Sequence, residues 1–281
     1  MKNWEDIISH KTFRYVDHTT ILKFQNKPYT AMTSFAIDDA LATSVSEKNS
    51  PPSIRLWSHP ETIVLGIPDA KLPYIDEGVD YLKESGFQVV VRNSGGLAVA
   101  LDESVINLSL IIPDVQHISI HACYEAMVRF IEYMFRDLTT EIEAYEIVGS
   151  YCPGDYDLSI GGKKFAGISQ RRIKDAAAIQ IYLDVDGDSQ ERAAHIRKFY
   201  EIGKKQAETK FFYPEVTPEV MGSLSQLLGA PLSVEDVKHR VYNTLRDFSE
   251  EIVVADFSED EKATFEKRYG QMVKRNEVVG D

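Results

Sequence analysis

The chain has 281 residues, of which 43% are hydrophobic and 27% charged, and its formal net charge is −13. This length suits one large domain with a substantial core, and the negative balance excludes a general nucleic-acid binder, which needs a basic surface to meet phosphates. No run approaches the roughly 18 to 20 apolar residues of a membrane span, and the first residues lack a secretory signal, so a cytoplasmic protein without membrane contact is expected.

Short β-type runs and helical patterns follow one another along the first two thirds of the chain. Apolar residues at four-residue spacing predict the helices, and continuous or alternating apolar runs predict the strands. In chain order the predicted elements are a helix over 37–45, strands at 54–57 and 62–65, a helix over 75–82 closed by Gly86, strands at 87–91 and 105–112, a helix over 117–138, and strands at 157–160 and 177–185. The strands predict one substantial sheet covered by the helices.

The last third shows helical signals only. The turn 186–189 leads into a first helix, and further helices are predicted between Pro218 and Gly229, from Ser233 and from Ser258. Each of these two serines is followed three residues later by an acidic residue, which is typical of a helix start. Strands first and helices afterwards predict an α+β fold.

The two cysteines lie in different contexts, which gives neither a disulfide framework nor a metal-binding pattern. Cys123 lies on the apolar face of the helix predicted over 117–138, so it is expected to be a core residue. Cys152 lies in the turn-rich segment Gly149-Ser150-Tyr151-Cys152-Pro153-Gly154, outside any periodic apolar face. No metal site is predicted.

Twelve residues after Cys152, the segment Gly162-Lys163-Lys164-Phe165-Ala166-Gly167 predicts a hairpin return in which Lys164 faces Cys152 across adjacent strands. A neighbouring ammonium favours the thiolate, which is the nucleophile in covalent acyl transfer. The same lysine can protonate the amine that leaves an amide donor. On these residues alone, the alternative is an inert thiol beside a solvated lysine pair.

A glycine-rich loop, Arg92-Asn93-Ser94-Gly95-Gly96-Leu97-Ala98-Val99, separates the strands predicted at 87–91 and 105–112. Paired glycines let backbone amides approach a ligand, and the guanidinium fork of Arg92 suits a polar head group. The alternative is a tight hairpin that needs positive φ. The loop has neither the Rossmann nor the P-loop glycine pattern.

Basic residues gather in a short stretch of this acidic chain, namely Lys163, Lys164, Arg171, Arg172 and Lys174. They predict a positive patch that would steer an acidic protein partner toward the site. The alternative is an ordinary solvated strand pair.

In order and spacing, the glycine-rich loop, the segment Tyr151-Cys152-Pro153-Gly154 and residues 162–170 resemble the biotin/lipoate protein ligase catalytic domain. Within that superfamily they look most like the cysteine-lysine amidotransferases, the octanoyl-[GcvH]:protein N-octanoyltransferases. The resemblance covers about residues 35–250. It implies an N-terminal extension over 1–34 packed on the domain, a catalytic domain over 35–250, and a C-terminal helix over 251–281.

The resemblance implies a mixed sheet flanked by helices, like that of class II aminoacyl-tRNA synthetases and biotin ligases, with a helical C-terminal portion and an acyl-chain tunnel. It implies that Cys152 is the acyl-thioester nucleophile and that Lys164 activates it. The substrate-binding residues that it implies are Arg92, Asn93, Ser94, Gly95, Gly96, Ala98, Gly167 and Ser169.

The implied reaction takes an octanoyl or lipoyl group from a lysine of the glycine-cleavage H protein, through the thioester, to a lysine of the lipoyl domains of 2-oxo-acid dehydrogenases. One amide is exchanged for another, so no nucleotide or other cofactor is implied. ATP-dependent lipoate ligases usually carry a second arginine, a third glycine and a histidine across the first motif and lack the cysteine. Here Val91, Leu97 and Leu101 take those places.

Three alternatives stay open. The first is an octanoyl transferase whose donor is acyl carrier protein, and the second is an ATP-dependent lipoate ligase. The third, from another class, is a catalytically silent acyl-binding or scaffold protein. The residues do not predict donor preference, octanoyl or lipoyl selectivity, or oligomeric state.

Overall fold

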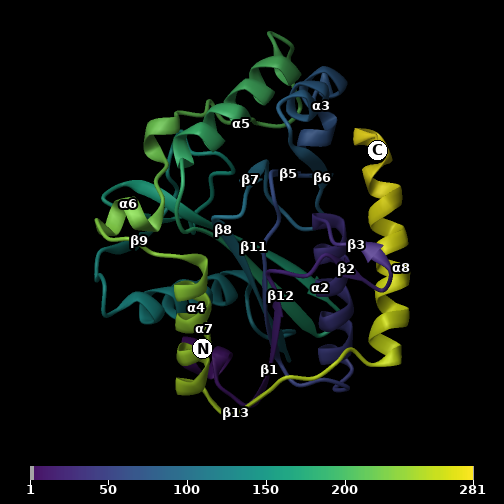
Figure 1. Ribbon diagram of the computed structural model, residues 1–281, viewed down its shortest axis with the longest axis vertical. Coiled ribbons are helices and arrows are strands. Elements are labelled where there is room, and N and C mark those ends of the chain that lie inside the picture. Colours follow the sequence, from purple (N-terminus) through teal and green to yellow (C-terminus); the bar gives the residue numbers. More distant parts are fainter. Residues whose placement is uncertain (1–2, 281) are drawn as a thin grey trace.

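The computed structural model describes residues 3–280 and shows a large and a small sheet with helices around them (Figure 1). The helices are α1 Trp4–Ile8, α2 Ala31–Ser46, α3 Ile75–Glu84, α4 Ile120–Phe135, α5 Ser189–Lys204, α6 Leu224–Leu228, α7 Val234–Asp247 and α8 Glu259–Asn276, with 3-10 turns at Asp69–Lys71, Pro218–Val220 and Glu277–Val279. The strands are β1 His10–His18, β2 Lys23–Phe24, β3 Lys27–Pro28, β4 Ser53–Trp57, β5 Thr62–Leu65, β6 Gln88–Val91, β7 Val99–Leu101, β8 Val105–Pro113, β9 Ile142–Ala144, β10 Leu158–Ile160, β11 Lys163–Ile173, β12 Ala176–Asp184 and β13 Ser249–Val253.

The large sheet has the order β13-β1-β4-β8-β12-β11-β10-β9. β1 pairs in parallel with β13 and β4, and the remaining pairs are antiparallel. β12 shows why the sheet is buried on both faces, since successive side chains of a strand point to opposite sides. Its Ala178 and Tyr182 enter one hydrophobic cluster, whereas Ile179 and Ile181 enter the other. The sheet therefore separates two cores.

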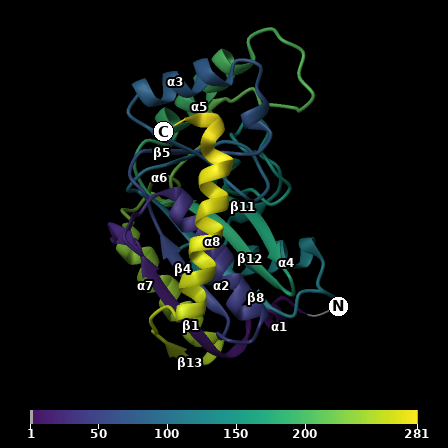
Figure 2. The same ribbon diagram turned by 90° about the vertical axis from the view of Figure 1, so that its right-hand side faces the viewer.

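Helices cover the two faces differently. α1, α4 and α7 pack over one face, where α4 contributes an apolar side that includes Cys123. α2 covers the other face, and Figure 2 shows α8 lying along the outside of α2. The small sheet, with α3 and α5 behind it, completes this second core. Cys123 is a fully buried core residue, as predicted.

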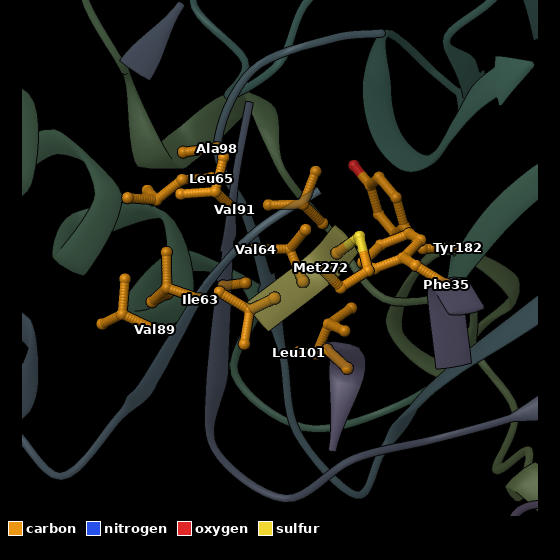
Figure 3. Close-up of a cluster of buried hydrophobic side chains, with 14 of the residues drawn as sticks. Phe35, Ile63, Val64, Leu65, Val89, Val91, Ala98, Leu101, Tyr182 and Met272 are labelled. Carbon is orange, nitrogen blue, oxygen red and sulfur yellow. The ribbon is translucent and has the colours of Figure 1, made fainter. Parts of the chain in front are cut away.

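The small sheet has the order β6-β5-β7, with β6 parallel and β7 antiparallel to β5. Figure 3 shows its side chains, among them Val64 and Leu101, gathered against Phe35 of α2 and Tyr182 of β12. The glycine-rich loop connects β6 to β7. The buried strands of the small sheet therefore hold this loop at the side that faces the large sheet.

The C-terminal helix fixes the strand that delivers this loop. The Asn276 amide at the end of α8 pairs with the backbone of Val91, the last residue of β6: its oxygen accepts from the Val91 N–H at 2.6 Å, and its nitrogen donates to the Val91 carbonyl at 3.1 Å. At the other end of α8, Glu261 forms a buried ion pair with Arg14 of β1. α8 therefore ties the small sheet to the large one.

The predicted α+β class is confirmed, and several details are corrected. There are two main sheets instead of one, and β13 lies between α7 and α8, where only helices were predicted. The helix predicted between Pro218 and Gly229 is a 3-10 turn followed by the short α6. Most side chains of β13 are polar and partly exposed, because this strand lies at the sheet edge, so its sequence lacks an apolar run.

The division of the chain at residues 34 and 250 stays a prediction. β1, from the proposed N-terminal extension, is an inner strand of the large sheet between β13 and β4, so this part of the extension lies within the fold. None of the helices within residues 3–280 has the length and apolar character that crossing a bilayer requires.

Candidate functional site

A cavity of about 220 Å³ lies between the glycine-rich loop, the turn that carries Cys152, and β11. Its lining mixes polar and apolar side chains and includes Arg92, Gly96, Cys152, Asp157 and Ser169. A second, smaller cavity of about 30 Å³ shares Arg92, Val99, Gly167, Ser169 and Tyr182 with the first. Its further lining is mainly apolar and includes Phe35, Trp57, Val64 and Leu101. The site thus joins a larger chamber of mixed lining to an apolar inner end, whose walls Phe35, Val64, Leu101 and Tyr182 appear together in Figure 3.

Cys152 lies in the segment between β9 and β10, and its side chain is half-buried in the wall of the larger cavity. Its backbone has a φ of +46°, a left-handed conformation that is uncommon outside glycine. The sulfur accepts hydrogen bonds from Arg92 Nη2 at 3.2 Å and from the backbone N–H of Leu97 at 3.1 Å. The glycine-rich loop therefore holds this sulfur with one charged and one neutral donor.

Lys164, near the start of β11, lies beneath the Cys152 turn and is completely buried. Its ammonium pairs with Asp157 Oδ1 at 2.8 Å and donates to the carbonyl oxygens of Tyr151 at 2.9 Å and Cys152 at 2.8 Å. Burial raises the pKa of the Asp157 carboxyl, although the nearby ammonium acts in the opposite direction. Sequence and structure agree that Lys164 and Cys152 meet, but the ammonium contacts the backbone oxygen of the cysteine instead of its sulfur.

Two positions, one in the glycine-rich loop and one beside it, leave no room for a side chain. A Cβ at Gly96, whose φ is +103°, would lie 2.1 Å from Arg92 Nη2 and 2.9 Å from the Cys152 sulfur. A Cβ at Gly66 would lie 2.0 Å from the carbonyl oxygen of Gly96. All three distances are below contact range, so any side chain at these positions would displace the loop or the groups beside it.

A buried hydrogen-bond chain supports the loop from behind. The Tyr200 hydroxyl of α5 accepts from the Ala98 N–H at 3.2 Å and donates to Asp69 at 3.0 Å, and Asp69 in turn accepts from the Gly66 N–H at 2.7 Å. Burial raises the pKa of the Asp69 carboxyl to about 6. No sequence pattern marks Asp69 or Tyr200, because they lie in different elements far apart in the chain.

The residues predicted for the site fall into two groups. Arg92, Gly95, Gly96, Cys152, Gly167 and Ser169 line the larger cavity. Lys164, Asn93, Ser94 and Ala98 are buried next to it and hold its walls: the Asn93 carbonyl accepts from Arg171, the Ser94 hydroxyl lies 3.5 Å from that of Ser169, and the Ala98 amide meets Tyr200. Lining residues that sequence reasoning missed are His121, Tyr124, Tyr156 and Tyr182.

The expected positive patch does not form as a free surface. Lys164 is paired with Asp157, Arg171 with Asp39 of α2, and Lys174 with Glu47 at the end of α2. Arg172 donates to the backbone oxygens of Val115 and Ile118. Lys163 stays exposed, so the patch is reduced and not absent. The partners of Arg171, Arg172 and Lys174 come from segments far away in the chain, which the local charge count cannot show.

The sequence profile of the family described as "Lipoyl protein ligase A/B catalytic domain" matches residues 30–246 of the chain. The chain belongs to this family. A relative from Oceanobacillus iheyensis, an "Octanoyl-[GcvH]:protein N-octanoyltransferase", is 64% identical over 277 residues, which is 99% of either chain. A "Lipoyl-[GcvH]:protein N-lipoyltransferase" from Listeria monocytogenes is 46% identical over 97% of both chains. The resemblance seen in the motifs is confirmed, and this member of the lipoyl protein ligase A/B family is an acyltransferase.

Solved structures of the family share the fold. A crystal structure of lipoate-protein ligase A bound with ATP superposes with a TM-score of 0.72 at 16% identity, covering 96% of this chain and 98% of that one. A putative lipoate protein ligase of T. acidophilum with bound lipoic acid gives a TM-score of 0.67, also at 16% identity, over 93% of this chain and 95% of that one. At this identity the likeness shows the ligase-type fold alone.

Proposed function

We propose that this family member is an octanoyl-[GcvH]:protein N-octanoyltransferase that works through a thioester on Cys152, without ATP. One observation carries the proposal: the half-buried sulfur of Cys152 lies in a cavity of mixed lining that adjoins an apolar end, with two hydrogen-bond donors aimed at it. The relatives named above support the choice of donor, since their names specify the H protein. Lipoyl domains of 2-oxo-acid dehydrogenases are the proposed acceptors.

The proposed reaction exchanges one lysine amide for another. The Cys152 thiolate attacks the carbonyl carbon of octanoyl-lysine; the C–S bond forms, the C–N bond breaks, and the departing nitrogen takes the electron pair and a proton. We assign this proton to Lys164, because an ammonium can give up a proton and a guanidinium cannot. The acceptor amine then attacks the thioester, sulfur leaves as a thiolate, and the surplus proton returns to Lys164.

The two cavities suggest how the acyl-lysine lies. We assign the amide to the larger chamber, next to the Cys152 sulfur, and the hydrocarbon chain to the apolar end, because apolar surface gains free energy when it leaves water. The proposed substrate-binding residues are those that the motifs implied, Arg92, Asn93, Ser94, Gly95, Gly96, Ala98, Gly167 and Ser169. Because an amide replaces an amide, the exchange needs no activation of a free acid, and no nucleotide or other cofactor is proposed.

The donor is tested by mixing the purified protein with octanoylated H protein and measuring the intact mass. We expect one octanoyl adduct, labile to hydroxylamine and mapped to Cys152, which passes to an apo-lipoyl domain without ATP. Three parallel reactions test the alternatives. Lipoylated H protein as donor measures selectivity between octanoyl and lipoyl groups. Octanoyl-acyl carrier protein tests the carrier-protein-dependent transferase, and free octanoate plus ATP tests the ligase. Product formed only with acyl carrier protein, or only with ATP, would contradict the proposed function.

Substitution of Gly167 by alanine tests the path of the acyl chain. Gly167 borders both cavities, and an added Cβ would lie 2.9 Å from Tyr182 Cε1 and 3.5 Å from Lys164 Cε. We expect G167A to slow octanoyl transfer by about 10- to 100-fold, since one methyl group in such a pocket changes binding by ~1–3 kcal/mol. Transfer of a butanoyl group, which would not reach the inner cavity, should change much less.

The matched control is Gly154→Ala in the same cavity wall, because the only atom near its added Cβ is Asp157 Oδ1 at 3.9 Å. G154A should transfer octanoyl at close to the wild-type rate. If G167A slowed butanoyl and octanoyl transfer equally, the chain would not pass this glycine.

A further inference from the structure

We propose that the rings of Tyr124 and Tyr156 form the entry through which the lysine side chain of each carrier protein reaches Cys152. The carboxylates of Glu125 and Asp155 beside these rings favour the lysine that carries no acyl group. The inference rests on the acyl transfer proposed above. It concerns the part of the larger cavity that the smaller, apolar cavity does not share.

The larger cavity opens to solvent beside the two rings. His121 of α4 and Asp155 of the Cys152 turn line this cavity and are exposed, whereas Tyr124 and Tyr156 line it and are half-buried. The smaller cavity shares none of these four residues, and most of its lining is buried. A lysine of another protein therefore reaches the sulfur between the tyrosine rings and the exposed glycines of the glycine-rich loop.

The rings at this entry hold one another in place. The ring centroids of Tyr124 and Tyr156 lie 5.1 Å apart, and the Tyr156 hydroxyl lies 3.1 Å from His121 Nδ1. A tyrosine presents an apolar face and a polar tip, so the rings can pack along the methylene groups of a lysine while their hydroxyls stay hydrated. Acylated and free lysines have the same methylene groups, so the rings serve both carriers.

Two carboxylates lie near these rings. Burial raises the pKa of the Tyr156 hydroxyl, and the charges of Glu125 and Asp155 raise it further. Within residues 3–280 neither carboxylate forms an ion pair or a side-chain hydrogen bond. The cation of the same cavity, Arg92, donates to the Cys152 sulfur instead. The entry therefore has negative charge that no other group of the described chain compensates.

This charge distinguishes the two lysines. An acyl-lysine is a neutral amide, whereas a free lysine arrives as an ammonium that the carboxylates and the faces of the tyrosine rings attract. The ammonium gives up one proton to solvent before its nitrogen attacks the thioester. The carboxylates therefore act on the binding of the acceptor, and we expect them to set its KM and to leave kcat nearly unchanged.

The two half-reactions are compared in the double variant Glu125→Gln/Asp155→Asn, which removes both charges and keeps both side-chain shapes. Thioester formation from octanoylated H protein should stay within about twofold of the wild type, because the donor lysine is uncharged. Transfer from the isolated thioester to an apo-lipoyl domain should show a KM raised about tenfold, with kcat within about threefold. Cleavage of the thioester by hydroxylamine, an uncharged acceptor at neutral pH, should proceed at the wild-type rate.

The matched control is Glu141→Gln/Glu143→Gln. Both carboxylates are exposed in or next to β9, and neither lines the cavity, so the net charge changes equally at another place. The KM of the acceptor should stay within about twofold of the wild type. Tyr156→Ala tests the ring separately and should raise the KM of donor and acceptor alike, by about fivefold.

An unchanged acceptor KM in E125Q/D155N would overturn the role of the carboxylates. Equal losses in both half-reactions would do the same, because the charges would then not distinguish the two lysines. Y156A with wild-type KM values for both carriers would remove the rings from the lysine path. Failure of the proposed function has a different signature: the wild-type protein itself then forms no thioester, and both proposals fall.

Discussion

Replacement of Cys152 by serine is expected to lower octanoyl transfer by at least about a thousandfold, because a serine hydroxyl is a far weaker nucleophile than a cysteine thiol at neutral pH. The hydroxyl would still fit the turn, since the hydrogen bonds from Arg92 and the Leu97 N–H are made to the side-chain atom in either residue. Single-turnover transfer from octanoylated H protein to a lipoyl domain measures the loss directly. No hydroxylamine-labile adduct should appear.

Cys123→Ser is the matched control. Cys123 is fully buried on α4 in the core on the far side of the large sheet, so its substitution affects stability and not the site. Transfer by C123S should stay within about twofold of the wild type at a temperature where the protein is folded. Substantial turnover by C152S would show that no thioester forms on this residue and would remove the proposed mechanism.

The sequence predicted the segments with a clear apolar pattern well. It missed the edge strands and also β1, an inner strand of the large sheet whose apolar residues are interrupted by charged ones. The strand at 62–65 has the predicted bounds, and α3 begins at the predicted Ile75. These segments have a continuous apolar run or a clear helical period, because they face the core. β9 and β13 lie at the two edges of the large sheet and carry several polar side chains, so their pattern does not differ from that of a loop.

The sequence predicted which residues form the site better than it predicted which of them touch one another. The spacing predicted that Cys152 and Lys164 lie close together. They do, because β10 and β11 form a hairpin that returns the chain. Which cation meets the sulfur depends on the left-handed backbone at Cys152 and on the side-chain path of Arg92 across the loop, and neither follows from spacing. The positive patch was overestimated for a related reason. Asp39 of α2 and Glu47 at the end of α2 come from another part of the chain and pair with Arg171 and Lys174.

Lys164→Gln is expected to destabilise the fold by about 3–5 kcal/mol, because removing one partner of a buried ion pair leaves the other charge uncompensated. The remaining charge is Asp157, which is 2% exposed. Burial raises the pKa of the Asp157 carboxyl, and K164Q removes the ammonium that lowers it. Protonation of Asp157 therefore favours the folded state, so the deficit of K164Q should shrink as pH falls through the folded-state pKa that Asp157 has in the variant. Urea unfolding at several pH values measures this.

The double variant K164Q/D157N separates stability from catalysis. It neutralises both partners and replaces the ion pair by two amides, so it should recover much of the stability lost in K164Q. Octanoyl transfer should nevertheless remain slowed by about a hundredfold or more, because the group that exchanges the proton with the amine is gone. A double variant with the stability and the transfer rate of the wild type would leave Lys164 without a catalytic role.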